Sequence, residues 1–372
     1  MNNPFTPGVI PPEAPFCNRQ KELKELKSYA SSSANVVLYS PRRYGKTSLV
    51  RRVQSGLSKK KVITIYVDLF GVTTIDEIAK RTARSVYLVT QKDKPLFKMV
   101  VTLFKTFRPV LKPTETGDSF TVTVEPATSS LTGIDLLEAT MTDLGMFIQA
   151  TPSGVNIAFD EFQEITELNS LEIEGVLRSH IQTQKASYFF VGSRRRVLLD
   201  MFNLRNRPFF QSSILYKLSR LPYEDLVRFI VECFNKSGKR CSKEIAEKIS
   251  KKAFQHPYYA QKLSFYVFEI SGKTIESADV SDAYDKVIED ERYFFEASTQ
   301  GLTIRQVSLL KALADDSSQP VYSSEFLSKH RLSQGLVQKA LPKLSNLDLI
   351  EKNDQNGWEI VDPVFREWLK RI

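Results

Sequence analysis

The sequence predicts an α/β protein built on a parallel sheet with helices on both faces, followed by an all-helical region and a winged helix. Three observations predict this fold class. Over residues 1–220, short apolar runs alternate with patterns of helical period, which is typical of a parallel sheet covered by helices. Residues 222–298 show helical patterns alone. Residues 302–372 combine three helical stretches with an alternating hairpin, the composition of a winged helix.

The length of the chain predicts several domains. At 372 residues it exceeds the usual size of a single hydrophobic core, so we expect two or three domains. We place the sheet domain at residues 1–220, with a proline-rich extended arm at 1–15 and an insertion at 112–130. An all-helical domain follows at 221–300, and the winged helix occupies 301–372.

The composition indicates a folded protein without a membrane segment. Apolar residues make up 42% of the chain, but no apolar run is long enough to span a bilayer, and the first residues lack the pattern of a signal peptide. We therefore expect a cytoplasmic protein with no membrane partner. The three cysteines lack the paired spacing of metal ligands and indicate reduced thiols. The sequence contains neither an HExxH motif nor a catalytic-triad signature, so no motif supports a metalloenzyme or an acyl-transfer enzyme.

The charge balance leaves contact with nucleic acid open. Lys and Arg outnumber Asp and Glu by 52 to 43, and the resulting net charge of +9 permits such contact without requiring it. Basic residues crowd residues 42–61 and form a second cluster at 194–207. Such clusters are usually solvated faces, but in the second one a phosphate-binding role competes with that interpretation.

The first strand, loop and helix carry a phosphate-binding pattern. Residues 36–38 form a short apolar run, and a helical period starts at Thr47. The intervening SPRRYGKT fits GxxxxGK[ST] except at Ser40, which replaces the first glycine and needs dihedrals open to a residue with a Cβ atom. We expect backbone N–H groups to face an anion, Lys46 to reach its terminal phosphates and the Thr47 hydroxyl to ligate Mg²⁺. The expected contact residues are Ser40, Pro41, Arg42, Arg43, Tyr44, Gly45, Lys46, Thr47 and Ser48.

The other elements of the sheet domain follow in order. A helix precedes the loop at 20–30, and residues 92–107 are compatible with a helix. The alternating insertion predicts a hairpin or an edge insertion. Further strands are predicted at 62–67, 155–159, 187–191 and 214–218, and further helices at 74–90, 133–150, 168–185 and 197–202.

Helices dominate the rest of the chain. In the all-helical domain they are predicted at 223–234, 242–254, 257–270 and 280–297. In the winged helix they are predicted at 303–314, 323–329 and 333–347. The wing is expected at 349–360, where the alternation turns at Asn356 and Gly357.

Two acids follow the predicted third strand, VNIAFDE. In a phosphate-loop site Asp160 would hold the Mg²⁺ shell opposite Thr47, and Glu161 would orient and deprotonate the attacking water. Alternatively, the two are solvated carboxylates at a strand end. The neighbouring GKT sequence favours the site.

Polar residues after the fourth strand are further candidates. Ligands bind at the carboxyl ends of such strands, so we expect Ser193 to sense the γ-phosphate. Arg194 or Arg207 would supply the charge that stabilises the transferred phosphate, in the same subunit or a neighbouring one, unless both are ordinary surface arginines. His256, beside a helix-starting proline, is either a reporter of the nucleotide's phosphate state or a capping or core histidine.

Taken together, the motifs resemble one family, the archaeal-type ATPases of the STAND class, a branch of the AAA+-like P-loop NTPases. The matching stretches cover nearly the whole chain and are, in order, the NPF start, FCNRQKEL, SPRRYGKTSL, YVDLFG, IAFDEFQEI, the GS after the fourth strand, NRPFFQS, HPYYAQKL and DPVFREWL. The chain departs from the family pattern at Ser40 and at Cys17 with Asn18.

The resemblance implies a fold and a ligand. It implies a sheet in the strand order 5-1-4-3-2, a helical lid domain and a C-terminal winged helix. It also implies ATP as the nucleotide, with Phe16 and Arg19 near the adenine and His256 and Pro257 approaching from the lid.

The leading functional hypothesis is an ATP-binding, Mg²⁺-dependent ATPase that acts as a molecular switch between ATP and ADP states and turns over slowly. The alternative is an ATP-regulated protein that binds DNA through its winged helix. The third predicted helix of that domain offers only a thin basic face with Lys339 and Lys343, and acids such as Asp348 and Glu351 lie close by. This favours a packing role or contact with a protein partner. A third hypothesis is a scaffold that oligomerises when loaded with nucleotide.

Overall fold

In the computed structural model the chain forms two compact units. One unit comprises Arg19–Ser219, and the other comprises Arg220–Ile372 together with N-terminal residues. The residues that the structure describes are 2–8, 10, 17, 19–113, 120–127, 130–168, 170–316, 319–353 and 357–372.

The first unit alternates strands and helices. After α1 (Gln20–Ser31) come β1 (Val36–Tyr39) and α2 (Lys46–Ser58), the predicted strand and helix on either side of the loop. The elements that follow are β2 (Ile63–Asp68), α3 (Ile75–Thr90), α4 (Lys94–Leu103), β3 (Phe107–Pro113), β4 (Phe120–Pro126), α5 (Gly133–Ala150), β5 (Val155–Asp160), the 3₁₀ helix η1 (Phe162–Leu168), α6 (Ser170–Ile181), β6 (Ser187–Gly192), α7 (Arg195–Asn203) and β7 (Ile214–Lys217).

The five-stranded sheet has the order β2-β5-β6-β1-β7, and its paired strands are parallel. Numbered along the chain, this is the predicted order 5-1-4-3-2, so the expected sheet is confirmed. Strand β6 lies between the two strands that carry the motifs, β1 and β5. Because the strands are parallel, their carboxyl ends meet at one edge, where Asp68 pairs with Asp160 and Tyr39 with Gly192.

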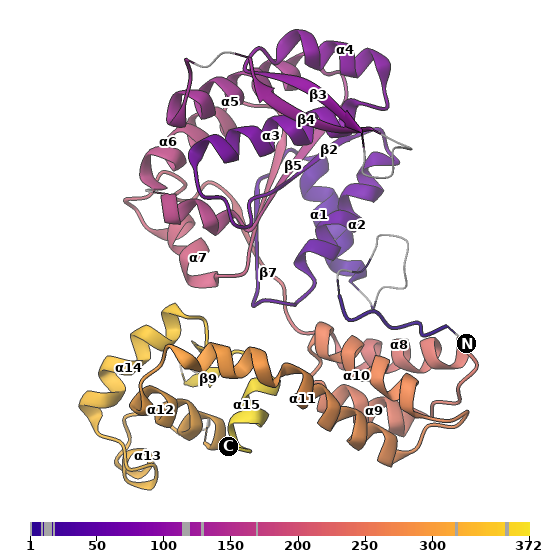
Figure 1. The fold of residues 1–372 in the computed structure, drawn as a ribbon, viewed down its shortest axis with the longest axis vertical. Helices are drawn as coiled ribbons and strands as arrows, with labels where there is room; N and C mark the ends of the chain where they lie inside the picture. Colours follow the sequence, from indigo (N-terminus) through magenta and orange to yellow (C-terminus); the bar gives the residue numbers. More distant parts are fainter. Residues whose placement is uncertain are drawn as a thin grey trace. The chain divides into compact units, whose positions relative to one another are not determined.

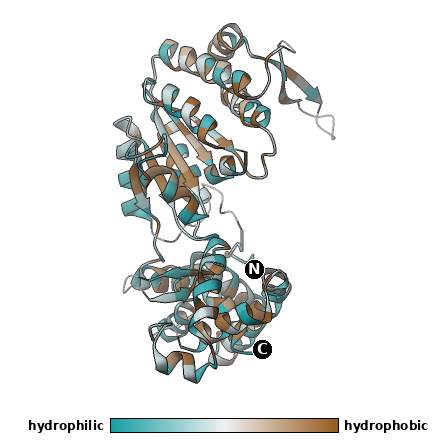
Figure 2. Ribbon diagram, turned by 90° about the vertical axis from the view of Figure 1, so that its left-hand side faces the viewer, coloured by the Kyte–Doolittle hydropathy of each residue, from teal (hydrophilic) through white to brown (hydrophobic). Residues whose placement is uncertain are grey.

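Helices cover both faces of the sheet (Figure 1). Helices α1 and α2 pack together on one face, where Gln54 of α2 donates to the carbonyl of Ile65 and to Asn156 Oδ1, both at 3.0 Å. Helices α3, α5 and α6 contribute to an apolar core on the other face, which also includes Val67 and Phe159. Figure 2 shows the central strands as mostly hydrophobic between these layers, as expected of a sheet buried on both sides.

The insertion is a hairpin, but it begins earlier than predicted. Strands β3 and β4 pair antiparallel from Phe107 opposite Pro126. The helical compatibility expected up to residue 107 is wrong beyond Leu103, where α4 ends. Tertiary contacts explain the difference, because the backbone N–H of Thr106 donates to Asp143 Oδ2 at 2.9 Å and Phe107 already pairs with the opposite strand. The hydroxyl of Tyr87 donates to the carbonyl of Phe107 at 2.8 Å and anchors the hairpin to α3.

The second unit is helical and ends in the predicted winged helix. Its elements are α8 (Tyr223–Lys236), α9 (Lys243–Lys252), α10 (Pro257–Ile270), α11 (Ser277–Gln300), α12 (Ile304–Asp315), α13 (Ser324–Lys329), α14 (Gln334–Asn346), β8 (Ile350–Lys352), β9 (Trp358–Ile360) and α15 (Pro363–Leu369). Strands β8 and β9 pair antiparallel as the wing, while Asn356 of the predicted turn lies outside the described residues. Across the part of the chain that the structure describes, no helix is both long and apolar enough to span a bilayer.

One apolar core joins the helices of the second unit to the winged helix. Phe295 of α11 packs against Trp368 of α15, with ring centroids 5.7 Å apart. The first residues, assigned above to the sheet domain, also belong to this core. Phe5 is 3% exposed and its ring lies 4.7 Å from that of Phe234 in α8, because burying an aromatic ring outweighs an extended surface course.

Candidate functional site

The loop between β1 and α2 accommodates Ser40 without strain. Its left-handed residues are Arg43 (φ +64°) and Gly45 (φ +82°), so the first position of the pattern does not need the conformational freedom of glycine. Ser40 is fully buried, and its hydroxyl donates to the carbonyl of Pro41 at 3.2 Å. Gly45, by contrast, has the backbone conformation that favours glycine, and it immediately precedes α2.

Lys46 is the first residue of α2 and is only 5% exposed. Its Nζ donates to the carbonyl oxygens of Ser40 at 3.0 Å and Pro41 at 2.8 Å. Burial lowers the pKa of Lys46 to about 8, although the nearby carboxylates of Glu161 and Asp160 favour its charged form. The ammonium group therefore lies between the loop and the acids at the end of β5.

Asp160, the last residue of β5, joins the loop helix to the sheet. Its Oδ2 accepts a hydrogen bond from the Thr47 hydroxyl at 2.7 Å and another from the Tyr66 hydroxyl, and its Oδ1 accepts from the backbone N–H of Glu161 at 3.0 Å. Burial raises the pKa of Asp160, and the hydrogen bonds from Tyr66 and Thr47 oppose that rise. The structure thus brings together two residues that are 113 positions apart in the chain.

The Thr47 hydroxyl and the Asp160 carboxylate fit a Mg²⁺ ion. Both are hard oxygen donors, and Mg²⁺ is usually held by one or two protein oxygens, with phosphates and water completing its shell. The described residues contain no group of three or more His, Cys, Asp or Glu side chains arranged for a metal. A cation held by these two oxygens would complete its coordination with ligand oxygens and water.

Glu161 is held in a left-handed backbone conformation (φ +51°), which is uncommon for a residue with a side chain. Its Oε2 accepts hydrogen bonds from Ser193 Oγ at 2.9 Å and from Gln163 Nε2 at 2.5 Å. A Cβ atom at Gly192 would lie 2.1 Å from Gln163 Oε1, so the glycine makes room for this amide. Ser193, predicted to face a phosphate, here binds the predicted base.

The two arginine candidates pair with acids of their own unit. Arg194 contacts Glu167 at 2.6 Å. Arg207 forms a two-pronged ion pair with the fully buried Glu174, one arm of which is 3.1 Å long. Their expected role toward a phosphate stays a prediction. Arg195, which was not singled out from the sequence, lies close enough to Lys46 to lower its pKa.

The remaining loop candidates differ in exposure. Arg42 and Arg43 are exposed, whereas Tyr44 and Ser48 are buried with Pro41.

The candidates for contacts outside the phosphate loop are spread over both units. Arg19 immediately precedes α1, is buried and pairs with Glu22 at 2.8 Å. Phe16 lies outside the described residues. His256 and Pro257 begin α10 in the other unit. The His256 ring is buried 4.8 Å from that of Tyr259, and its side chain makes no capping hydrogen bond, as expected of a core histidine. Its contact with a nucleotide stays a prediction.

Sequence reasoning missed Tyr66 and Gln163. Gln163 follows the paired acids in the DEFQ stretch, so a polar residue this close to the site was a usable signal. Tyr66 carries no such signal, because it precedes the end of another strand.

Comparison with known families assigns the chain to two kinds of domain. Residues 16–249 match a family described as an ATPase domain predominantly from Archaea. Residues 293–371 match a probable winged helix domain. Among curated proteins, none matches the chain.

Solved structures share the fold over nearly the whole chain. The Walker-type ATPase PABY2304 of Pyrococcus abyssi has a TM-score of 0.70 and 16% identity, with 96% of each chain covered. The ORC2 protein of Aeropyrum pernix, in its ADPNP and ADP complexes, has a TM-score of 0.58 and 16% identity, covering 99% of this chain and 96% of that one. At these identities the likeness is one of fold.

Proposed function

The chain belongs to the family of ATPase domains found predominantly in Archaea, and on this premise we propose that it binds ATP with Mg²⁺ and hydrolyses it as a molecular switch. The observation that carries the proposal is the 2.7 Å hydrogen bond between Thr47 and Asp160, beside the buried ammonium of Lys46. This proximity supports the proposal, because phosphate-binding and metal-binding groups must converge on one triphosphate for ATP to be hydrolysed.

Binding would use the loop and the start of α2. The loop N–H groups and the positive end of the α2 dipole favour the phosphates, and Lys46 would exchange its two carbonyl partners for phosphate oxygens. Thr47 and Asp160 would hold Mg²⁺, which neutralises charge on the β- and γ-phosphates when bound. The Aeropyrum pernix ORC2 protein, which shares the fold, forms ADPNP and ADP complexes, and this likeness supports a nucleotide as the ligand.

Hydrolysis would use Glu161 as the base. Its Oε2 accepts hydrogen bonds from the Ser193 hydroxyl and the Gln163 amide, which orient the carboxylate, and its other oxygen can accept the proton from water. We expect turnover to be slow. Arg194 and Arg207 are the candidates for stabilising the transferred phosphate, provided that each leaves its carboxylate partner.

The switch is the finer part of the proposal. We assign the chain to the STAND class, with nucleotide binding changing the arrangement of the two units and the winged helix moving with α11. Phe16 and Arg19 would approach the adenine, and His256 and Pro257 would approach the nucleotide from the helical unit. A nucleotide-dependent oligomer and a protein partner for the winged helix fit such a switch.

Replacing Glu161 by Gln tests the reaction. We expect wild-type protein to release phosphate from ATP slowly and Glu161→Gln to lower the rate at least about 100-fold, with ATP affinity unchanged, since the base acts on water and not on binding. Glu172→Gln is the matched control, because Glu172 is an exposed residue of α6. Equal hydrolysis by wild type and Glu161→Gln would contradict the assignment of the base.

The winged helix favours a second function, ATP-regulated binding of DNA. Exposed basic side chains of α14 include Lys339 and Lys343, but the acids Asp348 and Glu351 follow within the same domain. We expect the full chain to bind duplex DNA weakly, with a shallow dependence on salt concentration. Tight binding with a steep salt dependence that is lost in Lys339→Glu would establish the DNA function instead.

A further inference from the structure

We propose that Tyr66 is a positioning residue for the metal-binding carboxylate, which its hydroxyl holds facing Thr47. The inference rests on the proposed function, because it concerns how Asp160 is prepared for Mg²⁺. Tyr66 contacts neither phosphate nor water in this role and acts through Asp160 alone.

The sheet register places Tyr66 for this contact. Tyr66 of β2 pairs with Ala158 of β5, and Asp68 pairs with Asp160 two residues further on. Side chains two positions apart on a strand share a face, so Tyr66 and Asp160 are diagonal neighbours on the face covered by α2, within reach of a long aromatic side chain. The Tyr66 hydroxyl donates to Oδ2, the same oxygen that accepts from Thr47.

The ring of Tyr66 is held from the other side by the loop helix. The guanidinium carbon of Arg51 lies 4.1 Å from the ring centroid, within the range of a cation–π contact. Arg51 is four residues after Thr47 in α2, so the two side chains lie on one face of that helix. Two side chains of α2 therefore contact this part of the sheet: Thr47 bonds to Asp160, and Arg51 packs on the ring of Tyr66. Tyr66 in turn donates to Asp160.

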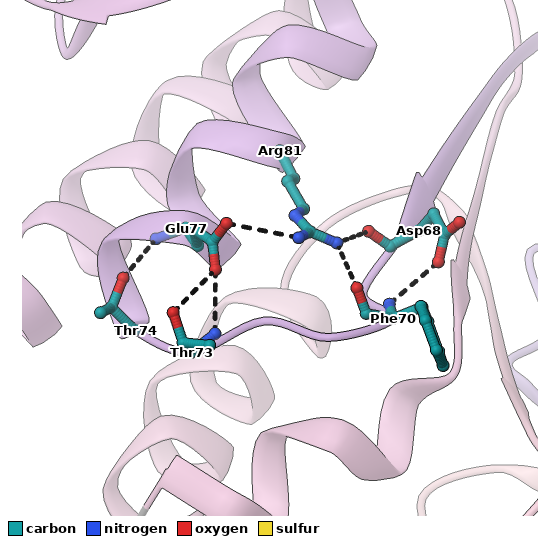
Figure 3. Close-up of polar contacts among 6 residues, drawn as sticks. All are labelled: Asp68, Phe70, Thr73, Thr74, Glu77 and Arg81. Atoms are coloured by element: carbon teal, nitrogen blue, oxygen red, sulfur yellow. Dashed lines mark hydrogen bonds and ion pairs between the residues drawn. The ribbon is translucent and has the colours of Figure 1, made fainter.

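The backbone of β2 is fixed on both sides of this contact. Ser85 of α3 donates to the carbonyl of Tyr66 at 2.9 Å. At the end of the strand and just beyond it, Arg81 donates to the carbonyls of Asp68 at 3.0 Å and Phe70 at 2.8 Å and pairs with Glu77 (Figure 3). The strand end therefore cannot shift without breaking several hydrogen bonds, and the phenol keeps its position.

A phenol suits this position for an electrostatic reason. A lysine or arginine bound to Asp160 would orient the carboxylate but would also neutralise the charge that attracts a divalent cation. A neutral hydroxyl orients it while leaving that charge in place. The carboxylate is thus directed toward Thr47 before any ligand binds, which lowers the cost of ordering it on binding.

Tyr66→Phe removes the hydroxyl and keeps the ring over which Arg51 lies. The measurement is binding of a fluorescent, non-hydrolysable ATP analogue during a Mg²⁺ titration, which needs no turnover. We expect the Mg²⁺ concentration at half-effect to rise about tenfold, the lower range for loss of an outer-shell partner, with analogue affinity in EDTA unchanged. The matched control is Tyr216→Phe, because Tyr216 also lies on an edge strand and donates to a carboxylate, Glu25, at 2.5 Å, away from the site.

The outcomes separate this inference from the proposed function. A Mg²⁺ half-effect in Tyr66→Phe that equals those of wild type and the control overturns the positioning role while leaving the ATP site standing. Wild-type protein whose analogue binding ignores Mg²⁺ overturns both. If Tyr66→Phe does not fold, Arg51→Leu carries the test: it keeps the hydroxyl but frees the ring, and we expect a rise of about threefold. No rise in that variant overturns the inference as well.

Discussion

Two buried lysines, one in each unit, bind backbone carbonyls in opposite electrostatic settings. Lys239 is 8% exposed, and its Nζ donates to the carbonyls of Phe268 and Ser271, the latter at 2.5 Å. These carbonyls belong to the last turn and end of α10, where the helix dipole favours a cation. Lys46 also donates to two carbonyls, but it begins α2, where the dipole disfavours one.

The difference separates a structural lysine from a functional one. Lys239 satisfies carbonyls that the end of a helix leaves without partners, so the fold alone accounts for it. Lys46 sits at the positive end of α2, and burial lowers its pKa to about 8. The neighbouring acids Asp160 and Glu161 and the carbonyls of Ser40 and Pro41 offset part of this cost. A phosphate ligand is the partner to which a charged lysine at a helix N-terminus is suited.

The largest expected effect comes from Lys46→Met. Removing the ammonium takes a buried positive charge from the phosphates, so ATP affinity should fall at least about 100-fold, or about 2.7 kcal/mol. The variant leaves the carbonyls of Ser40 and Pro41 without this donor, but it also removes a charge that is costly at a helix N-terminus. Because these two effects oppose each other, the melting temperature should change little. Isothermal titration with ATP and Mg²⁺, together with thermal unfolding, checks both. Unchanged ATP affinity would show that Lys46, like Lys239, has only a structural role.

Lys239→Met should behave in the opposite way. Its carbonyl partners at the end of α10 would stay buried without a donor, which costs about 2 kcal/mol of unfolding free energy. Chemical denaturation of the second unit's helices measures this loss. ATP affinity should remain that of wild type, and a fall in affinity as large as that of Lys46→Met would break the comparison.

ATP affinity should also depend on pH through Lys46. The charged form binds phosphate, so above its pKa of about 8 binding must take up a proton, and affinity should fall by up to about tenfold per pH unit. The unfolded chain holds this proton up to about pH 10.5, so the same group makes unfolding free energy rise with pH between these values. Titrations in buffers of different ionisation heat measure the uptake. No uptake at pH 9 would contradict the lowered pKa.

The smallest expected effect is that of Gln163→Leu. Hydrogen bonds at the nucleotide site must be exchanged for contacts with ATP or water during turnover, whereas Lys239 keeps its carbonyl partners throughout. Losing one of the two donors to Glu161 should raise hydrolysis about fivefold, since one hydrogen bond is worth about 1 kcal/mol, and should leave ATP affinity unchanged. A phosphate-release assay measures the rate. A fall in rate would show that Gln163 supports catalysis and does not restrain the base.

Most of the fold could be predicted because local patterns of apolar residues specify its strands and helices. The strands and the winged helix follow from periodicity, and the strand order followed from the family resemblance. The start of the hairpin was missed because residues 104–107 keep apolar spacing compatible with a helix until Pro109. The convergence of Thr47 and Asp160 was predictable. Thr47 lies at the start of the helix that follows β1, Asp160 ends β5, and the places of both strands in such a sheet are known.

The partners of these residues were not predictable from local sequence. Tyr66 reaches Asp160 only through the register of β2 on β5, and no local pattern specifies register between strands far apart in the chain. The pairing of Arg207 with Glu174 is likewise tertiary. The sequence shows that arginines cluster at 194–207, but not that the buried carboxylate of Glu174 already pairs with one of them. This pairing decides how much positive charge remains for a phosphate.

The central claim is that the loop from Ser40 to Thr47 and the carboxylate of Asp160 converge on one triphosphate. The most direct measurement is a crystal structure with Mg²⁺ and a non-hydrolysable ATP analogue. We predict the γ-phosphate against Lys46 and the metal at the Thr47 hydroxyl, on the side where Asp160 faces it. An analogue bound away from this loop, with Lys46 still on the carbonyls of Ser40 and Pro41, would contradict the account.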